Sequence, residues 1–284
     1  MTDSTTDTDN RCYRHPDRET FVKCQRCGRS ICGQCQTLAP VGVHCPECVR
    51  EARGSAAASV RPIGRRFARV VSPSGGRPIV SFAIIGLCLV IYAIQYFTGD
   101  ERSPVTNDLI YAPFLTSTQP WRMMTSIFIH ASILHVALNM YSLWVVGPTL
   151  EAVLGRIRYL VLFLVAGFGG SVAVLLIAPA GEGVLGASGA IFGLFGAYFI
   201  IARRMGGNAT YVLVIIVLNL VIGFVPGLGI AWQAHVGGLV AGGAVAFIYL
   251  ETRQRSRRWV QVLLVALVTV ILIGLTVFKA SLLG

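Results

Sequence analysis

The sequence is poor in charged residues, and above all in acidic ones. Only 13% of its 284 residues are charged, and 13 Asp and Glu stand against 24 Lys and Arg. The chain is also 54% hydrophobic with a mean hydropathy of +0.67. This composition lies outside the range of soluble globular proteins. We therefore expect an all-α polytopic membrane protein.

Further absences argue against several classes of function and of targeting signal. Basic residues are not interleaved with aromatic ones, so the net charge of +11 does not predict nucleic-acid binding. The first ten residues lack an apolar stretch, so we expect no cleavable signal peptide. No carboxylate lies deep in an apolar run and no inverted repeat is visible, which argues against an ion-coupled transporter. Since more than half of the Lys and Arg precede residue 79, that segment is expected to face a cytoplasmic membrane surface.

Residues 11–50 are rich in cysteine. Two-residue gaps separate the members of four ligand pairs, which are Cys12 and His15, Cys24 and Cys27, Cys32 and Cys35, and Cys45 and Cys48. Such a gap lets both side chains bind one tetrahedral ion, so eight ligands suit two Zn²⁺ ions, with His44 left over. A disulfide framework is the alternative, but it needs an oxidising compartment. So small a segment buries little apolar surface, and metal binding would supply its folding free energy.

This order of pairs resembles the B-box-type zinc finger over residues 12–48. In that family the pairs interleave, which implies one ion held by Cys12, His15, Cys32 and Cys35, and a second held by Cys24, Cys27, Cys45 and Cys48. The last pair departs from the histidine-containing ending usual in the family. Because no coordination position stays open, a structural role, with a cytoplasmic protein as a partner, is expected rather than catalysis.

Seven apolar runs follow a basic linker at 51–78, and residues 1–10 are expected to be disordered. Each run is close to the length that a ~30 Å hydrocarbon core requires. We predict spans at 79–98, 123–149, 159–178, 187–202, 210–225, 231–250 and 259–279. Arginines cluster in alternate loops, at 156–158, 203–204 and 253–258. The positive-inside rule then predicts a cytoplasmic N-terminus and an external C-terminus, in a prokaryotic plasma membrane.

A serine and a histidine within these spans indicate chemistry. Ser188 is flanked by small residues in Gly186-Ala187-Ser188-Gly189. Small neighbours serve close helix packing, but they also let backbone N–H groups and a substrate carbonyl reach a nucleophile. His235 is costly in a membrane span and so is a functional candidate. Counted from the cytoplasmic arginines at 1.5 Å per residue, Ser188 lies ~22 Å and His235 ~27 Å away, so both belong to the outer part of the membrane.

The second predicted span adds His130, His135 and Asn139. His135 and Asn139 are four residues apart and therefore share a helix face. They could form an interhelical hydrogen-bonded patch, or they could donate hydrogen bonds to an oxyanion beside the serine. Since no carboxylate is placed to orient His235, we expect a Ser–His dyad rather than a triad.

Together these motifs resemble the rhomboid intramembrane serine proteases over about residues 79–252. The matching motifs are Trp121-Arg122, His135-x3-Asn139, Gly186-x-Ser188-Gly189 and His235-x2-Gly238-x3-Gly242. The resemblance implies a six-helix core at 79–252, with one additional C-terminal transmembrane helix in 253–284. It implies that Ser188 is the nucleophile and His235 the general base, with an oxyanion site formed by His135, Asn139 and the Ser188 backbone N–H.

The same resemblance implies transmembrane protein substrates, cut near the outer leaflet without a catalytic cofactor. Phe192 stands where some members carry a tyrosine; a phenyl ring can still stack on an imidazole but cannot donate a hydrogen bond. The alternative is a proteolytically inactive relative that binds membrane helices as a chaperone or adaptor through the zinc module. Such relatives typically lack the serine or the histidine, and both are present here.

Overall fold

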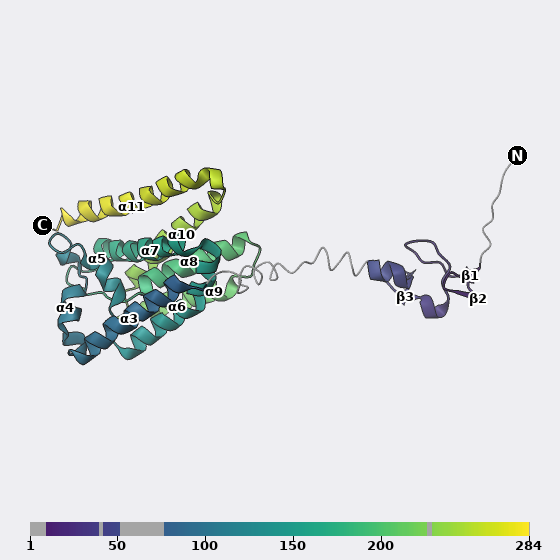
Figure 1. The fold of residues 1–284 in the computed structure, drawn as a ribbon, viewed down its shortest axis with the longest axis horizontal. Helices are drawn as coiled ribbons and strands as arrows, with labels where there is room; N and C mark the ends of the chain where they lie inside the picture. The colour runs from purple at the N-terminus through teal and green to yellow at the C-terminus, as the bar shows by residue number, and fades with distance from the viewer. Residues whose placement is uncertain (1–9, 40–41, 52–76, 226–228, 284) are drawn as a thin grey trace. The chain divides into compact units, whose positions relative to one another are not determined.

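The computed structural model describes residues 10–39, 42–51, 77–225 and 229–283. The chain divides into two compact units, Met1–Arg65 and Arg66–Gly284. Each unit has its own secondary structure (Figure 1). The expected disorder of residues 1–9 and the expected linker at 52–76 lie outside the described residues.

The buried residues of the N-terminal unit are mainly cysteines and not large apolar side chains. β1 (Arg11–Cys12) pairs antiparallel with β2 (His15–Glu19), and β3 (Thr37–Leu38) with β4 (Val43–His44). A 3-10 turn, η1 (Gly33–Cys35), lies between the two hairpins, and residues 46–51 are helical. Its buried cluster consists of Ile31 and six cysteines. These short strands are the exception to an otherwise helical chain.

The second unit is a bundle of helices (Figure 1). Its main helices are α3 (Ile79–Phe97), α6 (Ile133–Leu154), α7 (Arg156–Ile177), α8 (Ser188–Arg204), α9 (Thr210–Gly223), α10 (Trp232–Glu251) and α11 (Arg258–Ala280). Shorter elements connect them: η2 (Asp100–Arg102), α4 (Pro104–Leu109), η3 (Pro113–Leu115), α5 (Arg122–Thr125), η4 (Ser126–Phe128) and η5 (Arg255–Arg257).

The bundle is that of an integral, multi-pass membrane protein. Within the described residues, five helical segments are long and apolar enough to cross a membrane: α3, α6, α7, α10 and the segment 255–280 that contains α11. α8 has 17 residues and α9 has 14, which corresponds to ~26 and ~21 Å. Large apolar side chains on α3, α9 and α11 are exposed, as expected of surfaces that face lipid. The buried centre is formed by α7, α8 and α10.

The prediction of a continuous second span over 123–149 was wrong. A short helix, α5, and a 3-10 turn, η4, occupy its first part, and α6 begins only at Ile133. Ser132 is extended, and its side chain accepts a hydrogen bond from the His135 backbone N–H at 3.2 Å. A serine in this conformation is a helix N-cap, so the chain starts a new helix here although the apolar run continues. At its other end α6 passes through Pro148 to Leu154.

Two sets of hydrogen bonds, called clamps below, join α3 to α6 and to His130 just before it. Near the start of α3, the Glu151 carboxylate accepts hydrogen bonds from the backbone N–H groups of Val80 (3.0 Å) and Ser81 (2.8 Å) and from the Ser81 hydroxyl (2.7 Å). Near the end of α3, the Gln95 amide accepts from the His130 N–H at 3.1 Å and donates to the His130 carbonyl at 3.3 Å. Gln95, Ser81 and Glu151 are all buried. Burial of these groups is tolerated because each is hydrogen-bonded.

Glycines bring the backbones of α8 and α10 into direct contact. A Cβ atom built on Gly238 would overlap the Gly189 carbonyl oxygen, and one on Gly242 would overlap the Cα of Gly193. A larger residue at either α10 position would therefore push the two helices apart. This close crossing follows the role of small residues in membrane helix packing.

Candidate active site

Ser188 is the first residue of α8, where the helix leaves backbone N–H groups without partners. It is half-buried and follows the N-cap residue Ala187. The first N–H groups of a helix have no intrahelical acceptor, and the positive end of the helix dipole lies beside them. The chain reaches this point through Gly186, whose φ of +119° is accessible mainly to glycine. The serine hydroxyl thus stands where a developing negative charge is favoured.

His235 occupies the first turn of α10 and is buried, with 7% of its surface exposed. Its ring stacks on Phe192 at a centroid distance of 4.1 Å and an interplanar angle of 7°. Phe192 lies one turn along α8 from Ser188, so the stacking holds the imidazole beside the face of α8 that carries the serine. The expected phenyl–imidazole stack is therefore present.

A backbone contact joins the residue after the serine to the residue before the histidine. A Cβ atom on Gly189, which follows Ser188, would lie 3.2 Å from the carbonyl oxygen of Ala234, which precedes His235. Ser188 and His235 both line a cavity of about 790 Å³. Its walls come from α6, α8, α9, α10 and the loop before α8, with polar side chains that include Ser126, Ser132, His135, Asn139, Ser142, Ser171, Glu182 and Asn219.

No acid orients the histidine among the described residues. His235 Nδ1 is buried and has no hydrogen-bond partner there. Glu182 is the only carboxylate among the described residues that line the cavity, and no hydrogen bond joins it to His235 in that part of the chain. This arrangement is compatible with a two-residue Ser–His site.

His135 presents one ring edge to the loop before the serine. The Ala131 backbone N–H donates to His135 Nδ1 at 3.4 Å, which leaves Nε2 to carry the proton. A Cβ on Gly186 would lie 2.7 Å from this Nε2, so a larger residue there would collide with the ring. Asn139 is buried, lines the same cavity and donates one amide hydrogen to the His135 carbonyl at 2.9 Å. Its second amide hydrogen remains for another acceptor.

His130 is not among the described residues that line the cavity, and it does not lie on one helix with His135 and Asn139 as the single predicted span implied. It precedes α6, is fully buried, and packs edge-to-face against His135 at 5.2 Å. Gln95, which binds the His130 backbone from α3, was not identified from the sequence. A lone amide in an otherwise apolar span was the available signal, because such a group must find a partner in the membrane.

The connection between α3 and α6 is anchored by Arg122, from the Trp121-Arg122 motif. Its guanidinium donates to the backbone carbonyls of Asn107 and Ile110 and to the Gln119 side chain, and only 8% of the residue is exposed. The arginine therefore fixes the polar connection between α3 and α6 by satisfying carbonyls that would otherwise be unpaired.

In the N-terminal unit the ligand pairs interleave as the B-box resemblance implies. Cys12, His15, Cys32 and Cys35 form one group and Cys24, Cys27, Cys45 and Cys48 the other, each with its ligand atoms within 4.8 Å of one another. His44 belongs to neither group. The cysteines are free thiols, so the described chain contains no disulfide framework.

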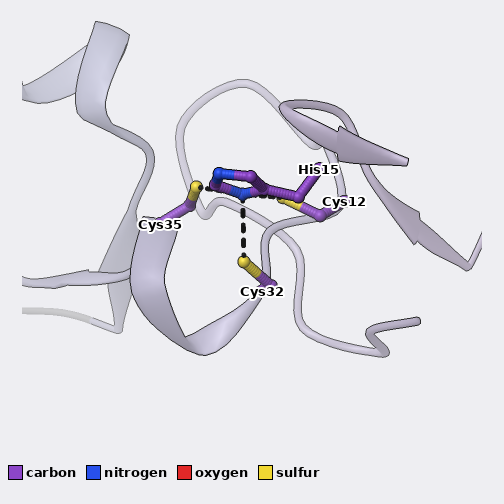
Figure 2. Close-up of side chains that lie close together, drawn as sticks. All are labelled: Cys12, His15, Cys32 and Cys35. Atoms are coloured by element: carbon purple, nitrogen blue, oxygen red, sulfur yellow. Dashed lines mark hydrogen bonds between the residues drawn. The ribbon is translucent and has the colours of Figure 1, made fainter. Parts of the chain in front are cut away.

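The spacing within the groups suits zinc. Figure 2 shows the His15 ring between three sulfurs. The His15 Nδ1 atom lies 3.4 Å from Cys32 Sγ, 3.4 Å from Cys35 Sγ and 3.8 Å from Cys12 Sγ. Tetrahedral zinc with Zn–S of about 2.3 Å and Zn–N of about 2.0 Å separates N and S by roughly 3.5 Å. In the second group Cys27 and Cys45 sulfurs are 3.8 Å apart. Backbone N–H groups of Cys45 and Cys48 donate to sulfurs there, which stabilises thiolates.

Comparison with known proteins places these features in a family. The family model of the rhomboid domain matches residues 117–252. The rhomboid protease GluP of Bacillus subtilis (strain 168) is 33% identical over 178 residues, which cover 59% of this chain and 34% of GluP. The rhomboid protease GlpG of Yersinia pseudotuberculosis serotype I (strain IP32953) is 31% identical over 186 residues, or 63% of this chain and 64% of GlpG.

A further relative is matched over nearly its whole length. The rhomboid-named protein YdcA of Bacillus subtilis (strain 168) is 31% identical over 185 residues, covering 63% of this chain and 92% of YdcA. By contrast, the chain spans only a third of GluP and of the RHOMBOID-like protein 1 of Arabidopsis thaliana. The region matched by the family model contains the serine, the histidine and the cavity described above. The chain belongs to the rhomboid family.

Proposed function

We propose that this protein is an intramembrane serine protease that cleaves transmembrane segments of other membrane proteins. The observation that carries the proposal is that Ser188 and His235, from the first turns of α8 and α10, line one cavity whose wall contains further polar side chains, inside an apolar bundle. A serine beside an imidazole is an activated nucleophile. An inactive, helix-binding relative would not need both groups in one cavity.

In the proposed reaction, the Ser188 hydroxyl attacks the scissile carbonyl and His235 accepts its proton. Since Nδ1 of His235 is buried, Nε2 is the ring atom left to face the serine. The resulting oxyanion accepts hydrogen bonds from the Ser188 backbone N–H, from Nε2–H of His135 and from the free amide hydrogen of Asn139. His235 then returns the proton to the leaving amine, and a water molecule hydrolyses the acyl-enzyme.

The substrate has to unwind before it can react. A backbone carbonyl inside a helix is hydrogen-bonded and shielded, and unpaired amides in hydrocarbon cost several kcal/mol each. The polar cavity supplies partners and water for such a segment. We therefore propose substrates with helix-weakening Gly or Pro near the outer end of their span, cut near the outer leaflet. We further propose that the N-terminus lies in the cytoplasm of a prokaryotic cell and the C-terminus outside, because the arginine clusters at 156–158, 203–204 and 253–258 favour the cytoplasmic side.

For the N-terminal unit we propose two structural Zn²⁺ ions, one in each group of four ligands. The ions would hold together a unit that has little apolar core of its own. All four positions around each ion are filled by protein ligands, so the proposed role is to bind a cytoplasmic protein and not to catalyse a reaction. Catalysis itself requires no cofactor in this proposal.

The direct test is labelling of the purified, full-length protein with a fluorophosphonate, together with cleavage of a single-span substrate. Ser188→Ala and His235→Ala should each abolish labelling and cleavage. Ser142→Ala is a matched control, because Ser142 lines the same cavity but has no proposed role in the reaction; this variant should behave as the wild type. Turnover in either dyad variant would show that the chemistry has been assigned to the wrong residues.

A further inference from the structure

Asn219 is a polar residue on an otherwise apolar helix that forms one wall of the cavity. α9 consists of aliphatic residues apart from Thr210, Tyr211, Gly223 and Asn219. The helix has a buried stripe at Val212, Ile216 and Gly223, and Asn219 falls on this stripe by its spacing. Asn219 nevertheless remains exposed, because at its level the stripe faces the cavity and not a neighbouring helix.

The Asn219 side chain keeps hydrogen-bonding capacity for another molecule. Within the described part of the chain its one hydrogen bond is a donation from Nδ2 to the Ile215 carbonyl at 2.9 Å. One amide hydrogen and the Oδ1 acceptor are left over. An amide that needs only helix packing would be disfavoured at such a site, because polar groups in a membrane are unfavourable unless they are paired.

We propose that Asn219 binds the unwound backbone of the substrate next to the cleaved bond, an inference that rests on the proposed protease function. Asn219 on α9 lines the same cavity as Ser188 on α8 and His235 on α10. Leu134 and Leu138 on α6 line it as well. An unwound segment in this cavity exposes peptide N–H and C=O groups. A side-chain amide offers an acceptor and a donor that match both of them. Asn219 thus positions the substrate through its peptide backbone, whichever side chains the substrate carries.

The experiment compares cleavage with labelling in one full-length preparation. Asn219→Leu should lower kcat/KM for a single-span substrate by about 3- to 10-fold, the loss expected for one or two hydrogen bonds. Fluorophosphonate labelling of Ser188 should not change, because the small probe does not occupy the α9 wall. Val217→Leu is the control: this residue is exposed on α9 but does not line the cavity. It should cleave as the wild type does.

A backbone-modified substrate makes the test specific to the proposed contact. A set of substrates, each with one ester in place of a peptide N–H near the cleaved bond, is compared in the wild type and in Asn219→Leu. At one position the ester should slow the wild type but cause no further loss in the variant. Equal cleavage by the variant and the wild type, or a parallel loss of labelling and cleavage, would overturn the proposal. Failure of the protease function itself would appear differently, as a wild type that neither cleaves nor labels at Ser188.

Discussion

Replacing Gly238 with alanine tests whether backbone contact between α8 and α10 sets the catalytic geometry. Gly238 lies one turn along α10 from His235, and its added Cβ would overlap the carbonyl oxygen of Gly189, the residue after Ser188. Because the Gly189 oxygen belongs to the backbone and not to a movable side chain, the helices themselves must separate, by roughly 1.5 Å to restore van der Waals contact. Overpacking of this kind typically costs about 1–3 kcal/mol of stability.

The loss of activity should be larger than the loss of stability suggests. A displacement of about 1 Å between reacting groups can reduce the rate about 100-fold, so Gly238→Ala should lower kcat/KM by about two orders of magnitude. The protein should remain folded, with a lower midpoint of thermal unfolding. Gly86→Ala on α3 and Gly274→Ala on α11 are matched controls, since an added Cβ would meet nothing within 4 Å at either position. A Gly238→Ala protein with wild-type kcat/KM would refute the assignment of this contact as the element that positions the dyad.

Three further results are expected from the same geometry. His135→Ala and Asn139→Ala should each reduce kcat by about 10- to 1000-fold while Ser188 still reacts with a fluorophosphonate, because each removes an oxyanion donor; unchanged kcat in both would exclude the proposed oxyanion site. Phe192→Leu should lower kcat without abolishing it, because the 4.1 Å stack that holds His235 is lost; Phe195→Leu, which lines the same cavity, is the control, and equal rates in the two variants would contradict a special role for the stack. Metal analysis of the full chain should find two zinc ions, and Cys12→Ser with Cys35→Ser should leave one; a wild type without zinc would contradict the metal assignment.

Much of the fold could be predicted because a membrane restricts what an apolar run can do. A run near 20 residues has to become a helix, and predicted spans such as 79–98 and 259–279 agree with α3 and α11 to within two residues at each end. Spacing alone left the partners of each cysteine pair open, and only the likeness to a known zinc finger suggested the interleaved groups that the structure contains.

The break before α6 is lost in hydropathy averaged over a window, because only residues 130–132 separate the apolar Ile127, Phe128 and Ile129 from Ile133. The decisive interaction is local and polar, the N-cap hydrogen bond of Ser132, and it outweighs the apolar pattern there. The contact between Gln95 and His130 joins residues 35 positions apart. A single sequence contains no information about such pairing, so the surroundings of His135 could not be derived from it.

The two clamps fix the position of α6, the helix that carries His135 and Asn139 of the proposed oxyanion site. Gln95 of α3 binds the chain just before α6, and Ser81 of α3 binds Glu151 in the last turn of α6. Because α6 is bound to α3 near both of its ends, translation of α6 along its axis and rotation about it are both resisted. A slip of one residue would roll the helix by ~100° and shift it by ~1.5 Å, which would carry Asn139 out of the cavity. The alignment of the proposed oxyanion donors therefore depends on a helix, α3, none of whose described residues lines the cavity.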